Sequence, residues 1–166
     1  MIFESERLSF RPIEQGDLDE LFNVWGNNET MRFCGGVITK EKIPQIIEYS
    51  CSQYKKYGNT VFAIIKNNML LGICGGNLDA DDPFNVEIVI HLAKEYEHQG
   101  YGTEALKSYI AWLKDGKRAT HIYASVHPDN QASLNMVKKC GFVQNGFVQY
   151  EDTGFVDEPY FELKLD

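Results

Sequence analysis

The sequence predicts an α/β protein built around one sheet of mixed strand direction. Two observations lead to this class. Apolar residues recur at helical spacing between residues 18 and 57, and strand-like patterns follow over residues 60–93. Asn67-Asn68 then separates two apolar runs by a two-residue connection, which is typical of an antiparallel hairpin. The expected order of elements is β-α-α-β-β-β-α-β-α-β-β.

The first third of the chain predicts one strand and two helices. RLSFRPI, residues 7–13, alternates in the manner of a strand, and Asp17 is the candidate N-cap of a helix over 18–27. Residues 31–36 predict a loop, and a second helix over 40–57 ends at Gly58-Asn59. The apolar stripes are Leu18, Leu21, Phe22 and Trp25 in the first helix, and Ile43, Ile46, Ile47 and Tyr54 in the second.

The middle third predicts three strands. Residues 60–66 and 69–79 flank the hairpin turn, and residues 84–93 form the third strand. The unbroken run Ile88-Val89-Ile90 indicates burial on both faces, which is typical of a central strand.

The last third interleaves helices with strands. We expect a helix over 100–115 with Gly116 as its C-terminal cap, and a strand over 120–126. A short helix from Asn130 to Cys140 stops at Gly141, and strands near 142–150 and 155–165 follow. The apolar face of the longer helix consists of Ala105, Leu106, Tyr109, Ile110 and Leu113.

Length and composition limit the possible functions. The 166 residues suit a single domain, 1–166, and 43% hydrophobic residues supply a core. The chain has no long apolar run and no secretory-type N-terminus, so we expect a cytoplasmic protein that makes no use of a membrane. The four cysteines lie far apart without a CxxC pair, which predicts neither a disulfide framework nor a metal site. The net charge of −8 disfavours nucleic acid and mildly favours a cationic substrate.

Gly100 and Gly102 stand at the start of the 100–115 helix, where glycine costs helix stability. The first N–H groups of a helix lack internal partners and carry the positive end of its dipole, so a glycine-rich entry can hold a phosphate. A simple turn is the alternative. Residues 100–105 also fit the dinucleotide pattern G-x-G-x-x-A, but residues 93–99 separate them from the preceding strand, which disfavours a nicotinamide oxidoreductase. The pattern GxxxxGK[ST] is absent.

Two longer stretches carry a family resemblance. VEIVIHLAKEYEHQGYGTEAL (86–106) resembles the acetyl-CoA motif of the GCN5-related N-acetyltransferases (GNAT), and HPDNQASLNMVKKCGF (127–142) resembles their companion motif. The strand RLSFRPI and the pattern from Phe155 to Leu165 resemble the branch that acetylates ribosomal-protein N-termini. The resemblance covers nearly the whole chain. It implies a mostly antiparallel central sheet with splayed central strands, flanking helices and acetyl-CoA as co-substrate without a metal.

The resemblance also implies a cofactor site. The backbone of residues 97–102 would hold the pyrophosphate, with Gly100 and Gly102 closest, and the strand from Ile90 to Leu92 would contact the pantetheine arm. Asn130 would reach that arm through its side-chain amide, although a helix N-cap is its alternative role. The candidate cofactor-binding residues are Ile90, His91, Leu92, Glu97, His98, Gln99, Gly100, Tyr101, Gly102, Thr103, Asn130 and Ser133.

The sequence departs from the family pattern at two positions. Relatives usually carry Gln or Arg where this chain has Glu97, and a carboxylate beside a pyrophosphate is unfavourable unless it points to solvent. Many relatives carry a tyrosine general acid where this chain has Val137. A departing thiolate needs little help from an acid, since thiols have a pKa near 8.5. These two departures motivate the alternative of a non-catalytic acyl-CoA-binding protein.

Acetyl transfer to an amine requires the neutral amine. An α-amine with a pKa of about 7.8 needs only a modest base at neutral pH, whereas a lysine near 10.4 needs more. Strand alternation places Glu87, Val89 and His91 on one face, so Glu87 is the first candidate base and His91 the second. Tyr123, Tyr150, His121 and His127 are expected in the sheet surface or core.

The acceptor is expected to be a small-molecule or peptide amine, attacked directly in a ternary complex. Trp25, Glu29, Arg32 and Phe33, from the two N-terminal helices and their loop, are expected to shape its site. A monomer or a homodimer is expected from the resemblance.

Overall fold

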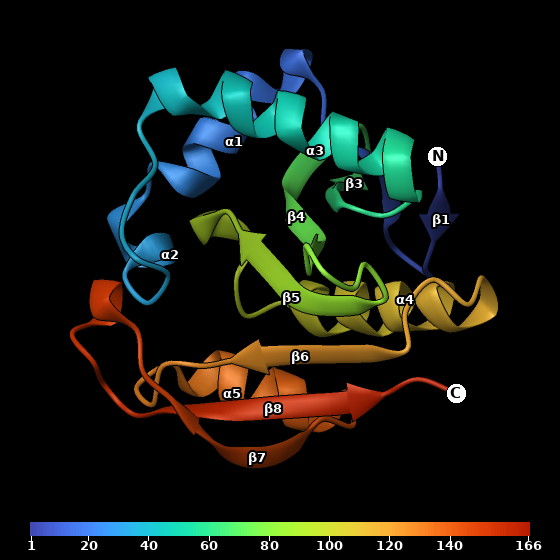
Figure 1. Ribbon diagram of the computed structural model, residues 1–166. Coiled ribbons are helices and arrows are strands. Elements are labelled where there is room, and N and C mark those ends of the chain that lie inside the picture. Colours follow the sequence, from blue (N-terminus) through green and yellow to red (C-terminus); the bar gives the residue numbers. More distant parts are fainter.

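The computed structural model describes residues 1–166 and contains one eight-stranded sheet in the order β1-β2-β3-β4-β5-β6-β8-β7 (Figure 1). Only the β5–β6 pair is parallel; all other neighbours are antiparallel. The mixed, mostly antiparallel sheet predicted from the sequence is therefore confirmed. The strands are β1 (Phe3–Glu4), β2 (Ser9–Pro12), β3 (Val61–Lys66), β4 (Met69–Leu78), β5 (Asn85–Leu92), β6 (His121–Ser125), β7 (Val143–Val148) and β8 (Glu158–Lys164).

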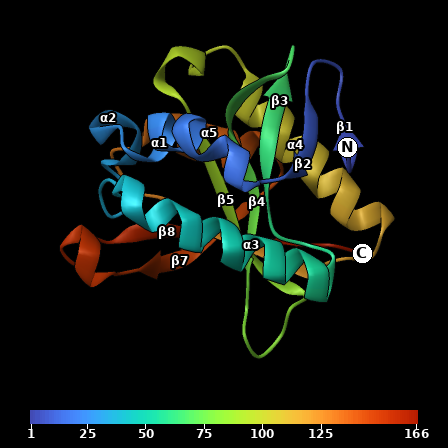
Figure 2. The ribbon, with the colours of Figure 1, turned by 90° about the horizontal axis from the view of Figure 1, so that it is seen from above.

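Helices cover both faces of the sheet (Figures 1 and 2). One face packs against α1 and α3 through a cluster that includes Leu21, Ile47 and Ile73. The other face packs against α4 and α5 through a larger cluster that includes Phe62 and Tyr109. The helices are α1 (Leu18–Trp25), α2 (Asn28–Met31), α3 (Ile43–Tyr57), α4 (Tyr101–Asp115) and α5 (Gln131–Lys139).

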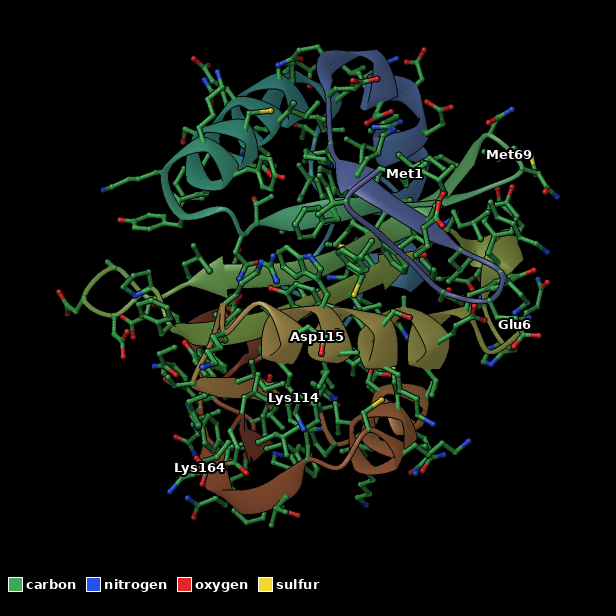
Figure 3. All side chains as sticks on the ribbon, turned by 90° about the vertical axis from the view of Figure 1, so that its right-hand side faces the viewer. Met1, Glu6, Met69, Lys114, Asp115 and Lys164 are labelled. Atoms are coloured by element: carbon green, nitrogen blue, oxygen red, sulfur yellow. The ribbon has the colours of Figure 1, made fainter.

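Local turn chemistry is as the sequence predicts at two places. Asn67 and Asn68 both have positive φ, 50° and 62°, as the two central residues of a tight hairpin require. Gly58 ends α3 in the left-handed conformation with φ 69°. The hairpin tip projects away from the molecule, with Met69 pointing outward (Figure 3).

Three boundaries differ from the prediction. The first helix ends at Trp25, and Asn27 starts the extra short helix α2 by accepting a hydrogen bond from the N–H of Thr30, at 3.0 Å, so part of the expected loop is helical. Gly116 follows α4 with φ −92°, and the left-handed conformation falls on Lys117 instead. The strand expected over 7–13 is limited to β2, and β1 pairs with it across a turn.

The carboxylate of Asp17 does not cap α1, although Asp17 occupies the position before it. It accepts two hydrogen bonds from the guanidinium of Arg11, at 2.8 and 2.7 Å, and one from the N–H of Glu14, at 2.9 Å. Asp17 is buried, so these donors compensate for the loss of water around its charge. The carboxylate therefore ties β2 to the start of α1.

We expect Asp17→Asn to lower the free energy of unfolding by about 2 kcal/mol or more, because it leaves a partly buried guanidinium without its counter-charge. Urea denaturation measures this. Asp19→Asn is the control, because that carboxylate pairs with Lys40 while 83% exposed, and we expect a change within about 0.5 kcal/mol. An equal loss in both variants would contradict the structural role of Asp17.

Strand β5 is central, but Ile88, Val89 and Ile90 are only half-buried. The apolar run was expected to be covered on both faces. All three residues instead line an opening in the sheet, because β5 and β6 separate along this stretch. No helix of the structure is both long enough and apolar enough to cross a lipid bilayer.

Candidate active site

Strands β5 and β6 form a fork in the middle of the sheet (Figure 1). They pair only at Asn85–His121, Val86–Ile122 and Glu87–Tyr123, although β5 continues to Leu92. On its other edge, β5 stays paired with β4 to the end. The backbone edge of β5 beyond Glu87 that faces β6 therefore has no strand partner.

A cavity of about 420 Å³ lies in this fork. One wall comes from β5, β6 and α5. The opposite wall comes from the loop at residues 33–35 and from the segment that leads into β8. The principal lining residues are Phe33, Cys34, Asn77, Glu87, Ile88, Ile90, His91, Ser125, Asn130, Ser133, Val137, Tyr150, Asp152 and Glu158.

The turn before α4 presents a row of free amides. None of the backbone N–H groups of residues 98–103 donates a hydrogen bond to another protein atom. The first internal acceptor is the carbonyl of Gly100, which receives the N–H of Glu104 at 3.1 Å. Gly100 has a φ of 81°, and His98 shares the left-handed conformation with φ 60°. Six successive unpaired amides at a helix N-terminus form a site for an anion.

Arg7, which sequence analysis did not single out, holds this turn in place. Its Nη1 donates to the carbonyl of Gln99 at 3.2 Å, and its Nε donates to the carboxylate of Glu104 at 2.6 Å. A Cβ added to Gly100 would lie 3.4 Å from Nη2 of Arg7. The guanidinium therefore lies beside the free amides while its charge is paired with the carboxylate of Glu104.

Glu97 differs from its expected role in two ways. Its N–H donates to the carbonyl of Lys94 at 3.3 Å, so the row of free amides begins at His98 rather than at Glu97. Its carboxylate pairs with the ammonium of Lys94 at 3.1 Å instead of standing alone in solvent. Lys94 also pairs with Glu29, at 2.9 Å. One ammonium group is thus shared by the two carboxylates, which compensates part of the negative charge of Glu97.

Gly102 faces α5 at close range. A Cβ added there would lie 3.2 Å from Sδ of Met136 and 3.7 Å from Cδ1 of Leu92. Tyr101 points the other way, into the core, where its hydroxyl accepts a hydrogen bond from Nζ of Lys66 at 2.7 Å. Thr103 contributes its free N–H to the row of amides. The chain thus keeps bare backbone where α4 approaches α5.

Asn130 and Ser133 both line the cavity from the start of α5. Oδ1 of Asn130 accepts the N–H of Ser133 at 3.3 Å, which makes Asn130 the N-cap of α5. The Nδ2 group of Asn130 has no partner within the protein and remains available to a ligand. Val137 is buried and contributes only apolar surface at the position where relatives carry a tyrosine.

Glu87, Val89 and His91 share the face of the sheet covered by α1 and α3. Val89 packs against that cluster, and Trp25 of α1 contacts His91. Glu87 lines the cavity, and its carboxylate makes no ion pair or hydrogen bond within the protein. A side chain with free lone pairs at the point where β5 and β6 begin to separate can accept a proton from a bound molecule.

His91 is placed differently. Its Nδ1 accepts a hydrogen bond from Nε1–H of Trp25 at 3.1 Å, so its lone pair is occupied and its proton lies on Nε2. Desolvation lowers the pKa of the imidazole to about 4. His91 is therefore neutral near pH 7 and offers a hydrogen-bond donor rather than a base, which leaves Glu87 as the better candidate.

The depressed pKa of His91 predicts a stability effect in acid. The imidazole of His91 binds a proton near pH 6.5 in the unfolded chain but only near pH 4 in the folded chain. The free energy of unfolding therefore falls as the pH decreases through this window. We expect Tm to fall less between pH 7 and pH 4.5 in His91→Gln than in the parent protein. His98→Gln, at a side chain 79% exposed, is expected to behave like the parent. Identical pH dependence in all three proteins would contradict the assignment.

Several cavity residues were not identified as site residues from the sequence. Asp152 and Glu158 carry no local motif, and Tyr150 and His127 were expected in the sheet surface or core but line the cavity. Phe33 lines it as expected and stacks on His127 with ring centroids 4.8 Å apart. Trp25, Glu29 and Arg32 do not line it: Trp25 supports His91, Glu29 pairs with Lys94, and Arg32 lies over the ring of Phe33.

The comparison with protein families matches this architecture. Residues 7–143 match the model of the acetyltransferase (GNAT) domain. The chain belongs to the GNAT family. It is thus an acetyltransferase of the class that uses acetyl-CoA, as the sequence motifs indicate.

Related GNAT proteins cover almost the whole chain. The uncharacterized N-acetyltransferase YoaA of Bacillus subtilis is 24% identical over 152 residues, covering 89% of this chain and 86% of YoaA. A GNAT acetyltransferase structure from Bacillus anthracis aligns with a TM-score of 0.83 at 22% identity, covering 99% and 98% of the two chains. The ribosomal L7/L12 α-N-protein acetyltransferase RimL in complex with coenzyme A aligns with a TM-score of 0.84 at 16% identity, covering 99% and 98%. This GNAT chain therefore shares the fold with enzymes that modify protein N-termini.

Proposed function

We propose that this protein transfers the acetyl group of acetyl-CoA to a primary amine by direct attack in a ternary complex. The observation that carries the proposal is the row of six free backbone amides at residues 98–103, placed beside the open edge of β5. The RimL structure similar to this chain contains coenzyme A, which supports the same ligand here.

The residues present fit coenzyme A at two points. The free amides and the guanidinium of Arg7 match the charge of a pyrophosphate. The unpaired edge of β5 past Glu87 and the Nδ2 group of Asn130 match the amides of a pantetheine arm, which need hydrogen-bond partners in a narrow cleft. Bound coenzyme A would supply an activated acyl group at the fork.

The chain supplies the groups that handle the acceptor. The nitrogen lone pair attacks the thioester carbonyl, the C–N bond forms, the C–S bond breaks, and sulfur leaves as the thiolate. The nitrogen gives up one proton, and Glu87 accepts it, directly or through water. Because a thiolate is a good leaving group, Val137 in place of a tyrosine does not prevent the step.

The test is a screen of amine acceptors with two readouts. Free thiol release from acetyl-CoA reports turnover, and mass spectrometry reports a product heavier by one acetyl group. The proposal expects thiol release that depends on the acceptor. Tight acetyl-CoA binding without thiol release across small amines, peptide N-termini and lysine peptides would instead support a non-catalytic acyl-CoA-binding protein.

A further inference from the structure

Glu158 is a buried carboxyl group without a partner. The residue is only 4% exposed, and its Oε1 has no hydrogen-bond partner. Burying such a group without compensation costs free energy, so its retention in the cavity wall requires an explanation. A ligand that donates hydrogen bonds or carries positive charge would supply the missing partner.

Strand geometry places Glu158 on the same face of the sheet as Glu87. Phe161 belongs to the core cluster under α4 and α5, so alternation along β8 places Glu158 on the opposite face. Glu87 occupies that same face of the sheet. Ser125 of β6 and Tyr150 also line the cavity, joined by a hydrogen bond of 3.2 Å from Oγ to the tyrosine hydroxyl.

The ionisable side chains that line the cavity are mostly acidic. Glu87, Asp152 and Glu158 line it, none of them forms an ion pair, and no lysine or arginine lines it. Of its two histidines, His91 is neutral near pH 7, and Nδ1 of His127 lies 3.1 Å from the N–H and 3.9 Å from the carboxylate of Asp129.

Other side chains on this part of the sheet are already partnered. The carboxylate of Glu162, also on β8, lies 3.0 Å from Nε2 of His121. It also accepts a hydrogen bond of 3.0 Å from Nδ2 of Asn145. Glu162 therefore differs from Glu158, because its carboxylate already has partners within the protein. Because Glu87 and Glu158 stand on different strands, they can engage two separate groups of one ligand.

We propose that Glu158 binds a second cationic group of the acceptor, so that the preferred substrates are small diamines rather than monoamines. This inference rests on the proposed function of the same site. One nitrogen, neutral when it reacts, lies near Glu87, and the other, an ammonium, pairs with Glu158. The ion pair compensates the buried carboxylate and fixes the orientation of the substrate.

The test compares α,ω-diaminoalkanes of increasing chain length with the matched 1-aminoalkanes, using thiol release. We expect at least one diamine to exceed its monoamine tenfold or more in kcat/KM. In Glu158→Gln, which keeps the shape and removes the charge, KM for that diamine should rise about tenfold with kcat little changed, and the monoamine should be unaffected. Glu162→Gln, on the same strand and face but outside the cavity, should retain the preference.

Two outcomes overturn the proposal: no chain length shows the preference, or the preference survives in Glu158→Gln. A peptide with uncharged side chains that reacts faster than every diamine also overturns it. If acetyl-CoA binds but no amine is acetylated, the proposed function fails separately. Calorimetric titration of the diamines into the protein loaded with coenzyme A then decides the role of Glu158, because binding weakened by Glu158→Gln supports it and equal binding overturns it.

Discussion

Gly102→Leu is expected to weaken the binding of coenzyme A at least tenfold, or about 1.4 kcal/mol. A Cβ at this position would already lie 3.2 Å from Sδ of Met136, so a larger side chain must push α5 away or project over the free amides. Gly102→Ala should show a smaller effect, because only the sulfur of a flexible side chain has to move. Isothermal titration calorimetry with coenzyme A measures both variants.

The control for this experiment is Gly16→Leu. That glycine is exposed and distant in sequence from the cavity residues, and its added Cβ would meet only Oε1 of Glu14 at 3.9 Å. The Gly16→Leu variant should bind coenzyme A with the same affinity as the parent protein. Unchanged binding by Gly102→Leu, with thermal stability preserved, would remove the start of α4 from the cofactor site.

Glu87→Gln should lower kcat for acetyl transfer at least tenfold while leaving the affinity for acetyl-CoA nearly unchanged. The carboxylate lines the fork without an internal partner, and general bases contribute about 10² to 10⁴ in rate. The reduction therefore belongs in the proton-transfer step rather than in cofactor binding. Steady-state kinetics across a pH series measures it, together with a direct titration of acetyl-CoA.

Glu162→Gln is the matched control for Glu87→Gln, because its carboxylate lies outside the cavity and bonds with His121 and Asn145. It should retain kcat and the pH–rate profile. A Glu87→Gln enzyme whose pH–rate profile is the same as that of the parent would rule out Glu87 as the base. His91 is a poor substitute, since its Nδ1 lone pair is held by Trp25.

The turn of free amides before α4 could be predicted because its geometry is local. Gly100 and Gly102 lie at the start of α4, the helix whose free amides they expose. A short stretch of sequence therefore contains both the glycines and the amides. Asn130 was predictable for the same reason, as both a helix cap and a cavity residue. Glu97 was only partly predictable, because its neutralising partner Lys94 depends on how the preceding turn folds.

The part of the cavity that Glu158, Asp152 and Tyr150 line could not be predicted in the same way. Glu158, Asp152 and Tyr150 reach the cavity because β8 inserts between β6 and β7, which no local pattern specifies. The turn before β8, in red in Figure 1, contacts the loop that follows α2. At that contact an added Cβ on Gly35 would lie 2.9 Å from Oδ2 of Asp152, so segments more than a hundred residues apart close one wall.

The amino-acid sequence by itself determined the mixed sheet, the main order of helices and strands, the glycine-rich turn before α4 and membership of an acetyl-CoA-dependent family. These follow from periodicity, turn residues and motifs that act over a few neighbouring positions. Only the tertiary structure decided that the separation of β5 and β6 begins after Glu87, that burial keeps His91 neutral, and that Glu158 lies unpaired in the cavity. The reason is physical: burial and pairing of a charged side chain depend on which distant strands and helices pack around it, and local sequence does not encode those neighbours.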